Sequence, residues 1–247
     1  MEYTIENETL ALTASAAGGA LGRLSTRQGL PLLGEGTFVC FPWCGAIEGG
    51  WYEDRGFPYR EAGGTDGFAR EKEHLPAGRE SGRLAFRLEW PGSLGLWPWA
   101  FELESVHTLA GNRAESVCTA ENRSGRPMPV QWGFQAGLCC PFLPETGAEE
   151  YQLRFADGRV LPVTAELPEG PVAPADWVRL EHRETGRYLE VDTKAFPLLS
   201  LGWGDGTVLL GLRTGGGPGH DLAARPGTAR MEHGEKRSWR LAVTASL

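Results

Sequence analysis

Short runs of alternating apolar and polar residues recur along the whole chain. The alternation is clearest in Leu84–Trp90, Phe101–Leu109 and Ala114–Ala120. Because successive side chains of a strand point to opposite faces, this period of two predicts half-buried β-strands. Weaker runs predict further strands at 3–13, 38–44, 130–134, 152–155, 178–182, 188–191, 198–202, 208–213 and 239–243, and a short hairpin over 21–33 with its turn at Gly29 and Pro31. No segment longer than about ten residues follows the helical period, so the pattern predicts an all-β sandwich or barrel.

The turns between these runs are rich in glycine and proline. The 247 residues include 35 glycines and 17 prolines, in clusters without a repeat, which favours many turns over a collagen-like or disordered chain. The longest predicted loops are 141–150, 156–176 and 214–230. Strand patterns continue to the C-terminal end and no linker interrupts them, so residues 1–247 are predicted to form a single domain.

Charge and hydropathy exclude several classes of protein. The net charge of -8 argues against a nucleic-acid partner, because phosphate binding needs a basic face. No segment approaches the ~20 apolar residues of a membrane span. Residues 1–10 have neither the basic start nor the apolar run of a secretory signal. We therefore expect a cytoplasmic protein that binds neither nucleic acid nor membrane.

The five cysteines are expected to be reduced, buried and structural. Cys40 and Cys44 are four residues apart, and Cys139 and Cys140 are adjacent. Zinc sites usually show two cysteines separated by two residues, or nearby histidines at fixed spacing. A cytoplasmic compartment keeps thiols reduced, and a free cysteine packs as a small apolar side chain. Gly215–Gly219 lacks the lysine that follows in a phosphate-binding loop. The sequence thus predicts no metal and no cofactor.

Two stretches combine glycine with tryptophan and polar residues, Phe41–Arg70 and Arg126–Pro141. Glycine lets the backbone approach a ligand closely. Tryptophan offers a flat apolar face with a polar edge, which suits ring-shaped polar ligands such as sugars. We expect the two stretches to form opposite walls of one cleft.

Several motifs in these stretches occur in a known family. Phe41-Pro42-Trp43-Cys44-Gly45 is followed at the appropriate separation by Asp66-Gly67-Phe68-Ala69-Arg70, and Gly133-Phe134-Gln135 stands where the family has Gly-x-His. Further matches are Pro98–Phe101, Leu109–Gly111, Asn122, Pro127–Pro129 and Gly234-Glu235. The chain resembles the aldose 1-epimerase (galactose mutarotase-like) family, in its short bacterial branch. This resemblance implies a twisted antiparallel β-supersandwich, with a sugar cleft on the concave face of one sheet.

The resemblance also implies acid–base exchange of sugar anomers, but the residues that usually act as acid and base are replaced here. The family exchanges sugar anomers with a histidine acid and a glutamate base. Its two motif histidines correspond to Asp66 and Gln135, and the strand that carries the glutamate offers Gly211 or Arg213. An amide has no titratable proton, and a guanidinium stays protonated. Any acid–base pair must therefore come from other groups.

The candidate site residues follow from this comparison. Replacement acid–base groups are Asp66, Asp176 and His74, and candidate substrate-binding residues are Arg70, Gln135, Trp43, Trp132, Trp203 and Arg213. Each has a structural alternative. The two aspartates can cap backbone N–H groups in turns, Arg70 can form a structural ion pair, Gln135 can lie on the surface, and the tryptophans can belong to the core.

Three functions remain open at this point. The first is an isomerase that exchanges sugar anomers with a rebuilt acid–base pair. The second is a sugar-binding protein without turnover. The third is an enzyme for hexose phosphates, in which Arg70 and Arg213 bind the phosphate. The expected partner is a monosaccharide or sugar phosphate, and the expected state is a monomer or homodimer.

Overall fold

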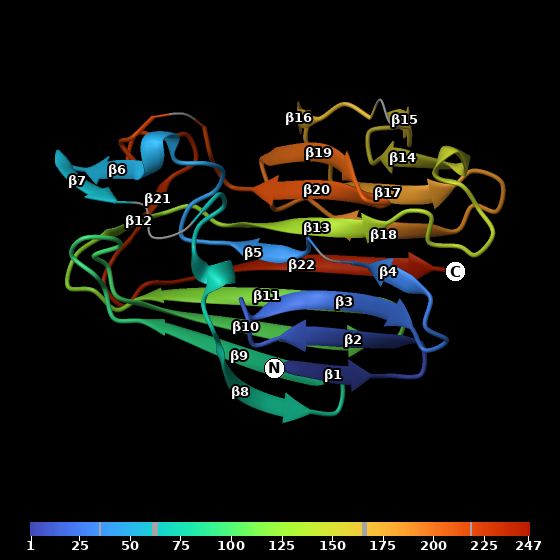
Figure 1. The fold of residues 1–247 in the computed structure, drawn as a ribbon, viewed down its shortest axis with the longest axis horizontal. Helices are drawn as coiled ribbons and strands as arrows, with labels where there is room; N and C mark the ends of the chain where they lie inside the picture. Colours follow the sequence, from blue (N-terminus) through green and yellow to red (C-terminus); the bar gives the residue numbers. More distant parts are fainter. Residues whose placement is uncertain (35, 61–63, 165–166, 218) are drawn as a thin grey trace.

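The computed structural model describes residues 1–247 except 35, 61–63, 165–166 and 218, and its main feature is a pair of antiparallel β-sheets (Figure 1). Within the described residues each sheet has nine strands. The first contains, in spatial order, β1 (Glu2–Glu6), β2 (Leu10–Ser15), β3 (Ala20–Thr26), β4 (Pro31–Leu33), β13 (Gly133–Cys139), β20 (Thr207–Arg213), β19 (Leu198–Gly204) and β16 (Gly170–Val172), with β5 (Phe38–Cys40) also paired to β13.

The second sheet is built mainly from the strands with the clearest alternation. Its order is β15 (Val160–Pro162), β14 (Tyr151–Phe155), β17 (Trp177–His182), β18 (Tyr188–Asp192), β22 (Lys236–Ser246), β11 (Arg113–Asn122), β10 (Phe101–Ala110), β9 (Arg83–Trp90) and β8 (Leu75–Glu80). Two small pairs lie outside the sheets, β6 (Trp51–Asp54) with β7 (Phe57–Arg60) and β12 (Met128–Val130) with β21 (Ala229–Met231). The single-turn 3₁₀ helices are η1 (Glu48–Gly50), η2 (Ala69–Glu71) and η3 (Ala148–Glu150).

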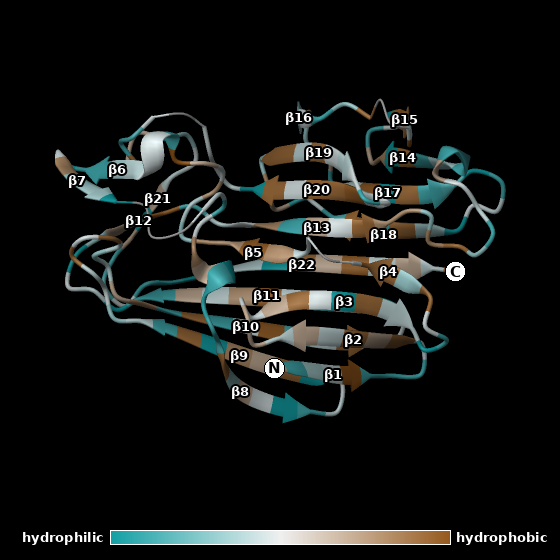
Figure 2. Ribbon diagram, in the orientation of Figure 1, coloured by the Kyte–Doolittle hydropathy of each residue, from teal (hydrophilic) through white to brown (hydrophobic). Residues whose placement is uncertain are grey.

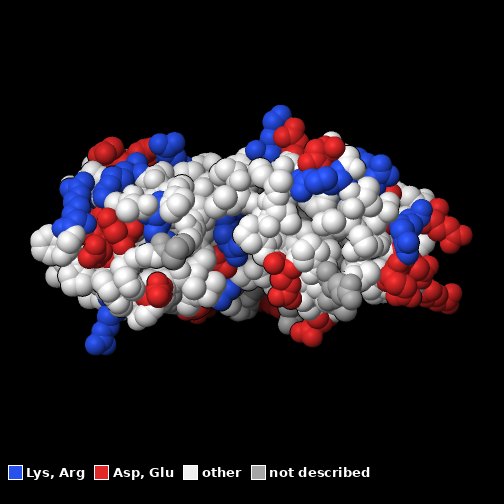
Figure 3. Space-filling model, turned by 90° about the horizontal axis from the view of Figure 1, so that it is seen from above, with Lys and Arg blue, Asp and Glu red and all other residues white. Residues whose placement is uncertain are grey.

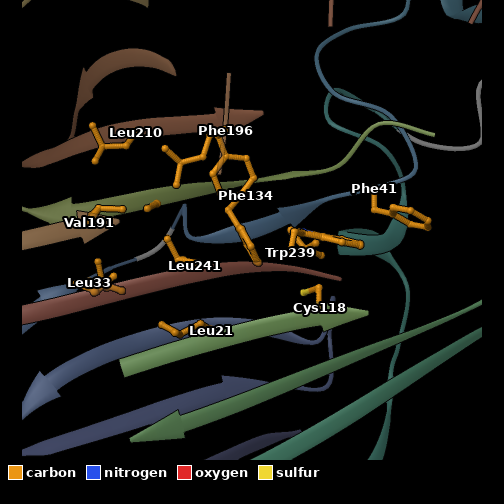
Figure 4. Close-up of a cluster of buried hydrophobic side chains, with 14 of the residues drawn as sticks. Leu21, Leu33, Phe41, Cys118, Phe134, Val191, Phe196, Leu210, Trp239 and Leu241 are labelled. Atoms are coloured by element: carbon orange, nitrogen blue, oxygen red, sulfur yellow. The ribbon is translucent and has the colours of Figure 1, made fainter. Parts of the chain in front are cut away.

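The core lies between the two sheets. Figure 2 shows that hydrophobic positions follow the strands of both sheets. Phe134 and Leu210 from the first sheet meet Trp239 and Leu241 from the second (Figure 4). Along β10 the buried residues alternate with partly exposed glutamates, as the period of two predicts. Burial of apolar surface on one face of each sheet is thus what holds the sandwich together.

The predicted strand at 3–13 is wrong in one respect, because the structure contains two strands there. β1 ends at Glu6, the chain turns, and β2 pairs back against β1. The Asn7 side chain accepts hydrogen bonds from the backbone N–H groups of Thr9 at 2.9 Å and Leu10 at 2.7 Å. An asparagine that binds the backbone in this way mimics a turn, and the alternating pattern alone did not mark it.

Several short strands were not predicted. β6, β7 and β8 lie in or just after the glycine-rich stretch 41–70, and β15 and β16 lie in the segment 156–176 that was predicted as loop. At the turn between β6 and β7, Arg55 and Gly56 have φ angles of 53° and 80°. Two successive positive φ angles are typical of a tight hairpin turn.

Two expectations from composition can be compared with the structure. All five cysteines are free, and four of them are buried. No helix in the described part of the chain is long and apolar enough to cross a lipid bilayer.

Candidate functional site

The central strands of the first sheet present a row of small and polar residues on their outer face. The strand register places Phe38, Gln135, Gly211 and Ser200 side by side across β5, β13, β20 and β19. The residues between them in sequence, including Phe134, point into the core. Because side chains alternate along a strand, the row faces away from the second sheet. On this outer face Phe38, Gln135 and Ser200 are partly exposed, and Gly211 is buried.

Two residues further along the same face, Arg213 forms a buried ion pair with Asp66. Arg213 donates from Nε to Asp66 Oδ1 at 2.9 Å and from Nη2 to Oδ2 at 3.0 Å. The Gly45 N–H also donates to Oδ1, at 2.7 Å, and Arg213 Nη1 donates to Ser200 Oγ at 3.0 Å. Only 3% of the Asp66 side chain is exposed. This bidentate geometry fixes the orientation of both side chains.

The Asp66 carboxylate determines the electrostatics of the pair. Burial lowers the pKa of Arg213, but the hydrogen bonds and negative charge of Asp66 outweigh burial, so the pKa is raised above its ordinary value. The guanidinium therefore stays charged. Breaking such a buried pair leaves an uncompensated charge in the protein.

The Asp66-Gly67 turn packs against the Phe41–Gly45 segment. Both turn residues have positive φ angles, 68° and 78°. The Asp66 carbonyl accepts from Phe41 N at 3.2 Å, and Asp66 N donates to the Gly45 carbonyl at 3.1 Å. A Cβ atom at position 67 would lie 2.1 Å from the Phe41 carbonyl oxygen. Glycine is therefore required at position 67 both for its φ angle and for this close approach.

Replacing Gly67 with alanine is expected to lower the free energy of unfolding by about 2 kcal/mol more than Gly56→Ala does. Gly56 has a similar φ of 80°, but a Cβ there meets nothing within 4 Å. The difference between the two losses of unfolding free energy therefore measures the cost of the clash with Phe41. Urea unfolding of both variants measures it, and equal losses would show that the turn does not need its contact with Phe41.

Two buried residues that the sequence analysis missed hold the loops around the pair. Gln131 accepts from Cys44 N at 3.1 Å and donates to Thr228 Oγ1 at 2.9 Å. Arg225 donates from Nη2 to the carbonyls of Cys44 and Ala46, each at 3.1 Å. Both connect the Phe41–Gly45 segment, which carries the N–H that binds Asp66, to the loop after β20. Gln131 lies within the stretch Arg126–Pro141 but outside its family motifs, and Arg225 lies in neither stretch.

A groove of about 450 Å³ opens beside Arg213. Its volume lies within the range of small-molecule sites. Its lining is mostly proline, glycine and leucine, contributed by Gly45, Pro171, Val172, Pro174, Pro197–Ser200, Gly211, Arg213, Gly215–Gly217 and Pro226. Among the described residues that line the groove, Arg213 is the ionisable one. An apolar wall with a few directional polar groups suits a ring that carries hydroxyls.

The structure brings four of the predicted site residues onto one face. Asp66 and Arg213 form the ion pair. Gln135 lies next to Gly211 in the outer row, and Phe38 lies on its other side. The Arg70 guanidinium stacks on the Phe38 ring at 4.3 Å from its centroid. Ser200, which was not predicted, joins this group through its hydrogen bond to Arg213.

Asp176 and His74 lie apart from this face. The Asp176 side chain is 67% exposed just before β17 in the second sheet, 4.0 Å from Lys194. His74 is fully buried, with Nε2 donating to the Ala69 carbonyl at 3.0 Å. Burial lowers the pKa of His74. Neither lines the groove beside Arg213, and we leave both out of the site.

The three candidate tryptophans pack with the core. Trp43 is fully buried against Tyr52, Phe68 and Trp97. Trp132 stacks on Trp239, and Trp203 is a partly buried neighbour of the core. Their side chains therefore contribute to stability, and none of them lines the groove.

The expectation of two opposite walls is wrong. β5, which ends immediately before the first stretch, pairs directly with β13 from the second, and Gln131 N of the second stretch donates to the Pro42 carbonyl of the first at 2.9 Å. The two stretches are thus neighbours within one wall. The opposite side of the groove comes from β16 and from the segment that leads into β19.

Acidic and basic side chains lie interspersed on the side of the molecule that carries β16 and the hairpin β6–β7 (Figure 3). Over the part of the chain that is described, this face has no extended basic patch.

The sequence and the structure were compared with those of known proteins. A search of curated proteins gave no match. A galactose mutarotase related enzyme from Lactobacillus acidophilus superposes with a TM-score of 0.87 at 17% identity, covering 100% of this chain and 98% of the other. A galactose mutarotase-like protein from Lactobacillus casei gives 0.85 at 18%, covering 100% of both chains. A galactose 1-epimerase from L. acidophilus gives 0.71 at 14%, covering 99% and 94%.

These likenesses confirm the predicted antiparallel sandwich of the galactose mutarotase-like type. The family model for aldose 1-epimerase matches residues 1–196, the greater part of the chain. The matched range includes Asp66, Arg70 and Gln135 and ends before Arg213. The chain belongs to the aldose 1-epimerase family.

Proposed function

We propose that this protein binds an aldose in its ring form in the groove beside Arg213, and that it does not exchange anomers by a rapid proton relay. Family membership and the groove support the sugar. The bidentate ion pair between Asp66 and Arg213 is the observation that argues against a rapid proton relay.

Exchange of anomers needs two proton-transfer groups. A base removes the proton of the anomeric hydroxyl while an acid protonates the ring oxygen, and the roles then reverse. Both Asp66 oxygens already accept hydrogen bonds from Arg213, and one also accepts from Gly45. Taking a proton from a sugar would therefore remove the negative charge that pairs with Arg213, on a side chain that is only 3% exposed. The Gln135 amide can donate a hydrogen bond to a ring oxygen but has no titratable proton.

The same groups are suited to holding a sugar. The Arg213 guanidinium, the Ser200 hydroxyl and the Gln135 amide offer directional donors on one face of the sheet. Prolines and Leu198 supply apolar surface for the C–H face of a pyranose. Because the donors are held by strand register and by the ion pair, little ordering is needed when a ligand binds.

The proposal predicts binding without turnover. Isothermal titration calorimetry with a panel of aldohexoses is expected to give heat for at least one sugar, whereas polarimetry on freshly dissolved α-anomers is expected to show no rate above buffer at micromolar protein. Acceleration of the optical change would overturn the second half of the proposal, and no heat for any sugar would overturn the first.

A matched pair of variants locates the binding. Ser200→Leu places a large side chain in the groove and is expected to abolish the heat of binding. Ser238→Leu, at an exposed position of β22 in the second sheet, is expected to leave it unchanged. Retained binding in Ser200→Leu would place the sugar elsewhere.

A phosphorylated sugar is the second candidate ligand, and Arg70 favours it. The Arg70 guanidinium is held against Phe38 and has no ion pair within the described residues. A fixed guanidinium without a carboxylate partner suits a phosphate group. The same calorimetric panel includes glucose and glucose 6-phosphate, and equal affinity for the two would remove the support for this candidate.

A further inference from the structure

An exposed aromatic stack stands on the hairpin β6–β7, outside the groove. The rings of Trp51 and His220 are parallel to within 10°, with centroids 3.7 Å apart. His220 Nδ1 also lies 3.0 Å from the Trp51 carbonyl oxygen. Trp51 remains 39% exposed. Because the imidazole covers one face of the indole, the exposed area lies on the other face and the edges. The stack therefore presents a fixed flat apolar surface to solvent.

Polar groups surround this surface on the same face of the hairpin. Trp51 is the Cα partner of Arg60, and Glu53 is the partner of Pro58. The alternate residues, Tyr52 and Asp54, are buried on the inner face. Paired residues on one face of a hairpin have Cβ atoms about 5 Å apart. An indole face flanked by a guanidinium and a carboxylate matches a sugar ring, which has apolar C–H faces and hydroxyls around its rim.

One residue of the stack, His220, follows closely in sequence on a residue that lines the groove. Gly217 lines the groove, and His220 follows three residues later. Three residues of fully extended chain span at most about 11 Å. His220 is held in place because its carbonyl accepts from Glu53 N at 2.8 Å, which ties the segment after the groove to β6. The Cα atom of His220 therefore lies within about 11 Å of that of Gly217 at the groove.

We propose that Trp51 and His220 form a second sugar subsite, so that the preferred ligand is a glycoside or short oligosaccharide and not a free monosaccharide. This inference rests on the proposed function of the groove. One ring occupies the groove beside Arg213, and the next ring stacks on the exposed indole face. Contacts in the groove orient the first ring, and the stack favours ligands that carry a second ring.

Calorimetric titration with matched pairs of sugars tests the proposal. Glucose is compared with maltose and cellobiose, and galactose with lactose. The wild-type protein is expected to bind at least one disaccharide about tenfold more tightly than the corresponding monosaccharide. Trp51→Ala is expected to abolish this difference while leaving monosaccharide affinity unchanged, and Trp51→Phe is expected to keep much of it.

Phe57→Ala is the matched control, because Phe57 is another exposed aromatic of the same hairpin and has no ring contact among the described residues. It is expected to leave the disaccharide preference unchanged. Equal affinity of the wild type for monosaccharides and disaccharides overturns the second subsite alone. Loss of the preference in Phe57→Ala as well as in Trp51→Ala assigns it to the hairpin fold and overturns the role of the stack. Absence of heat for every sugar, short or long, overturns the groove function itself.

Discussion

Replacing Arg213 with methionine is expected to lower the free energy of unfolding by about 4 kcal/mol at pH 7, since it leaves a buried carboxylate without its partner. Asp66 is almost completely buried, and Arg213 supplies two of the three hydrogen bonds that its oxygens accept. For a chain of this size the loss corresponds to a fall in melting temperature of roughly 8 to 16 °C. Urea unfolding at pH 7 measures the change.

The control is a pair of the same chemistry at the surface. Arg159 and Asp157 lie 2.7 Å apart, with 35% and 46% of their side chains exposed. Arg159→Met is expected to cost less than about 1 kcal/mol, because exposed ion pairs contribute little. Adding Asp66→Asn to Arg213→Met is expected to recover part of the loss by removing the unpaired charge. A loss in Arg213→Met no larger than in Arg159→Met would contradict the structural importance of the buried pair.

Replacing His107 with glutamine is expected to reduce the loss of stability between pH 6.5 and pH 4 by about 3 kcal/mol. Burial lowers the pKa of His107 to about 4, whereas an unfolded chain has a histidine pKa of about 6.5. Between these values the unfolded chain binds a proton that the folded protein does not, so stability falls as pH falls. The difference of 2.5 in pKa corresponds to about 3 kcal/mol.

The surroundings of His107 explain why it stays neutral. Its Nε2 donates to the Gly19 carbonyl at 3.1 Å, and the Ser116 hydroxyl donates to Nδ1 at 2.6 Å. His74 is nearby and also disfavours the charged form, and burial lowers the pKa of His74 as well. His74 therefore adds to the same acid sensitivity, and some of it is expected to remain in His107→Gln.

Urea unfolding at pH 6.5 and pH 4 measures the effect as a difference between proteins. His233→Gln is the control, because His233 lies on the surface and binds the Ser124 carbonyl at 2.9 Å. It is expected to keep the wild-type dependence on pH. The burial of His107 would be irrelevant to acid stability if His107→Gln lost as much stability as the wild type over this interval.

Part of the site could be predicted from the sequence. Asp66, Arg70, Gln135 and Arg213 were named from motifs and from strand parity, and the structure places them on one face. Trp43 was named for its residue type, but the type alone does not say whether an indole faces a ligand or the core. Gln131 and Arg225 were missed because their partners are distant in sequence, Arg225 and Cys44 being 181 positions apart. Ser200 was missed because it meets Arg213 only through the pairing of β19 with β20.

The strands fall into the same two groups, those that the sequence predicted and those that it missed. The long strands β9, β10, β11 and β22 were found because each has one buried face, which imposes a period of two on the residues themselves. The short strands β7, β15 and β16 contain no buried residue, and the four residues of β6 show buried positions only at Tyr52 and Asp54, too few to mark a period of two. They form only because a neighbouring strand supplies hydrogen bonds, and a neighbour is a property of the folded chain.

The sequence by itself determined that this protein is an antiparallel sandwich of the aldose 1-epimerase family, because alternation and ordered motifs are local properties. Only the tertiary structure decided which polar residues meet. It turned the replaced family positions into the ion pair of Asp66 and Arg213, made the two motif stretches neighbours in one wall, and brought Trp51 and His220 together in a stack. Each of these depends on strand register between segments far apart in the chain, and register is fixed only when both sheets bury their apolar faces together.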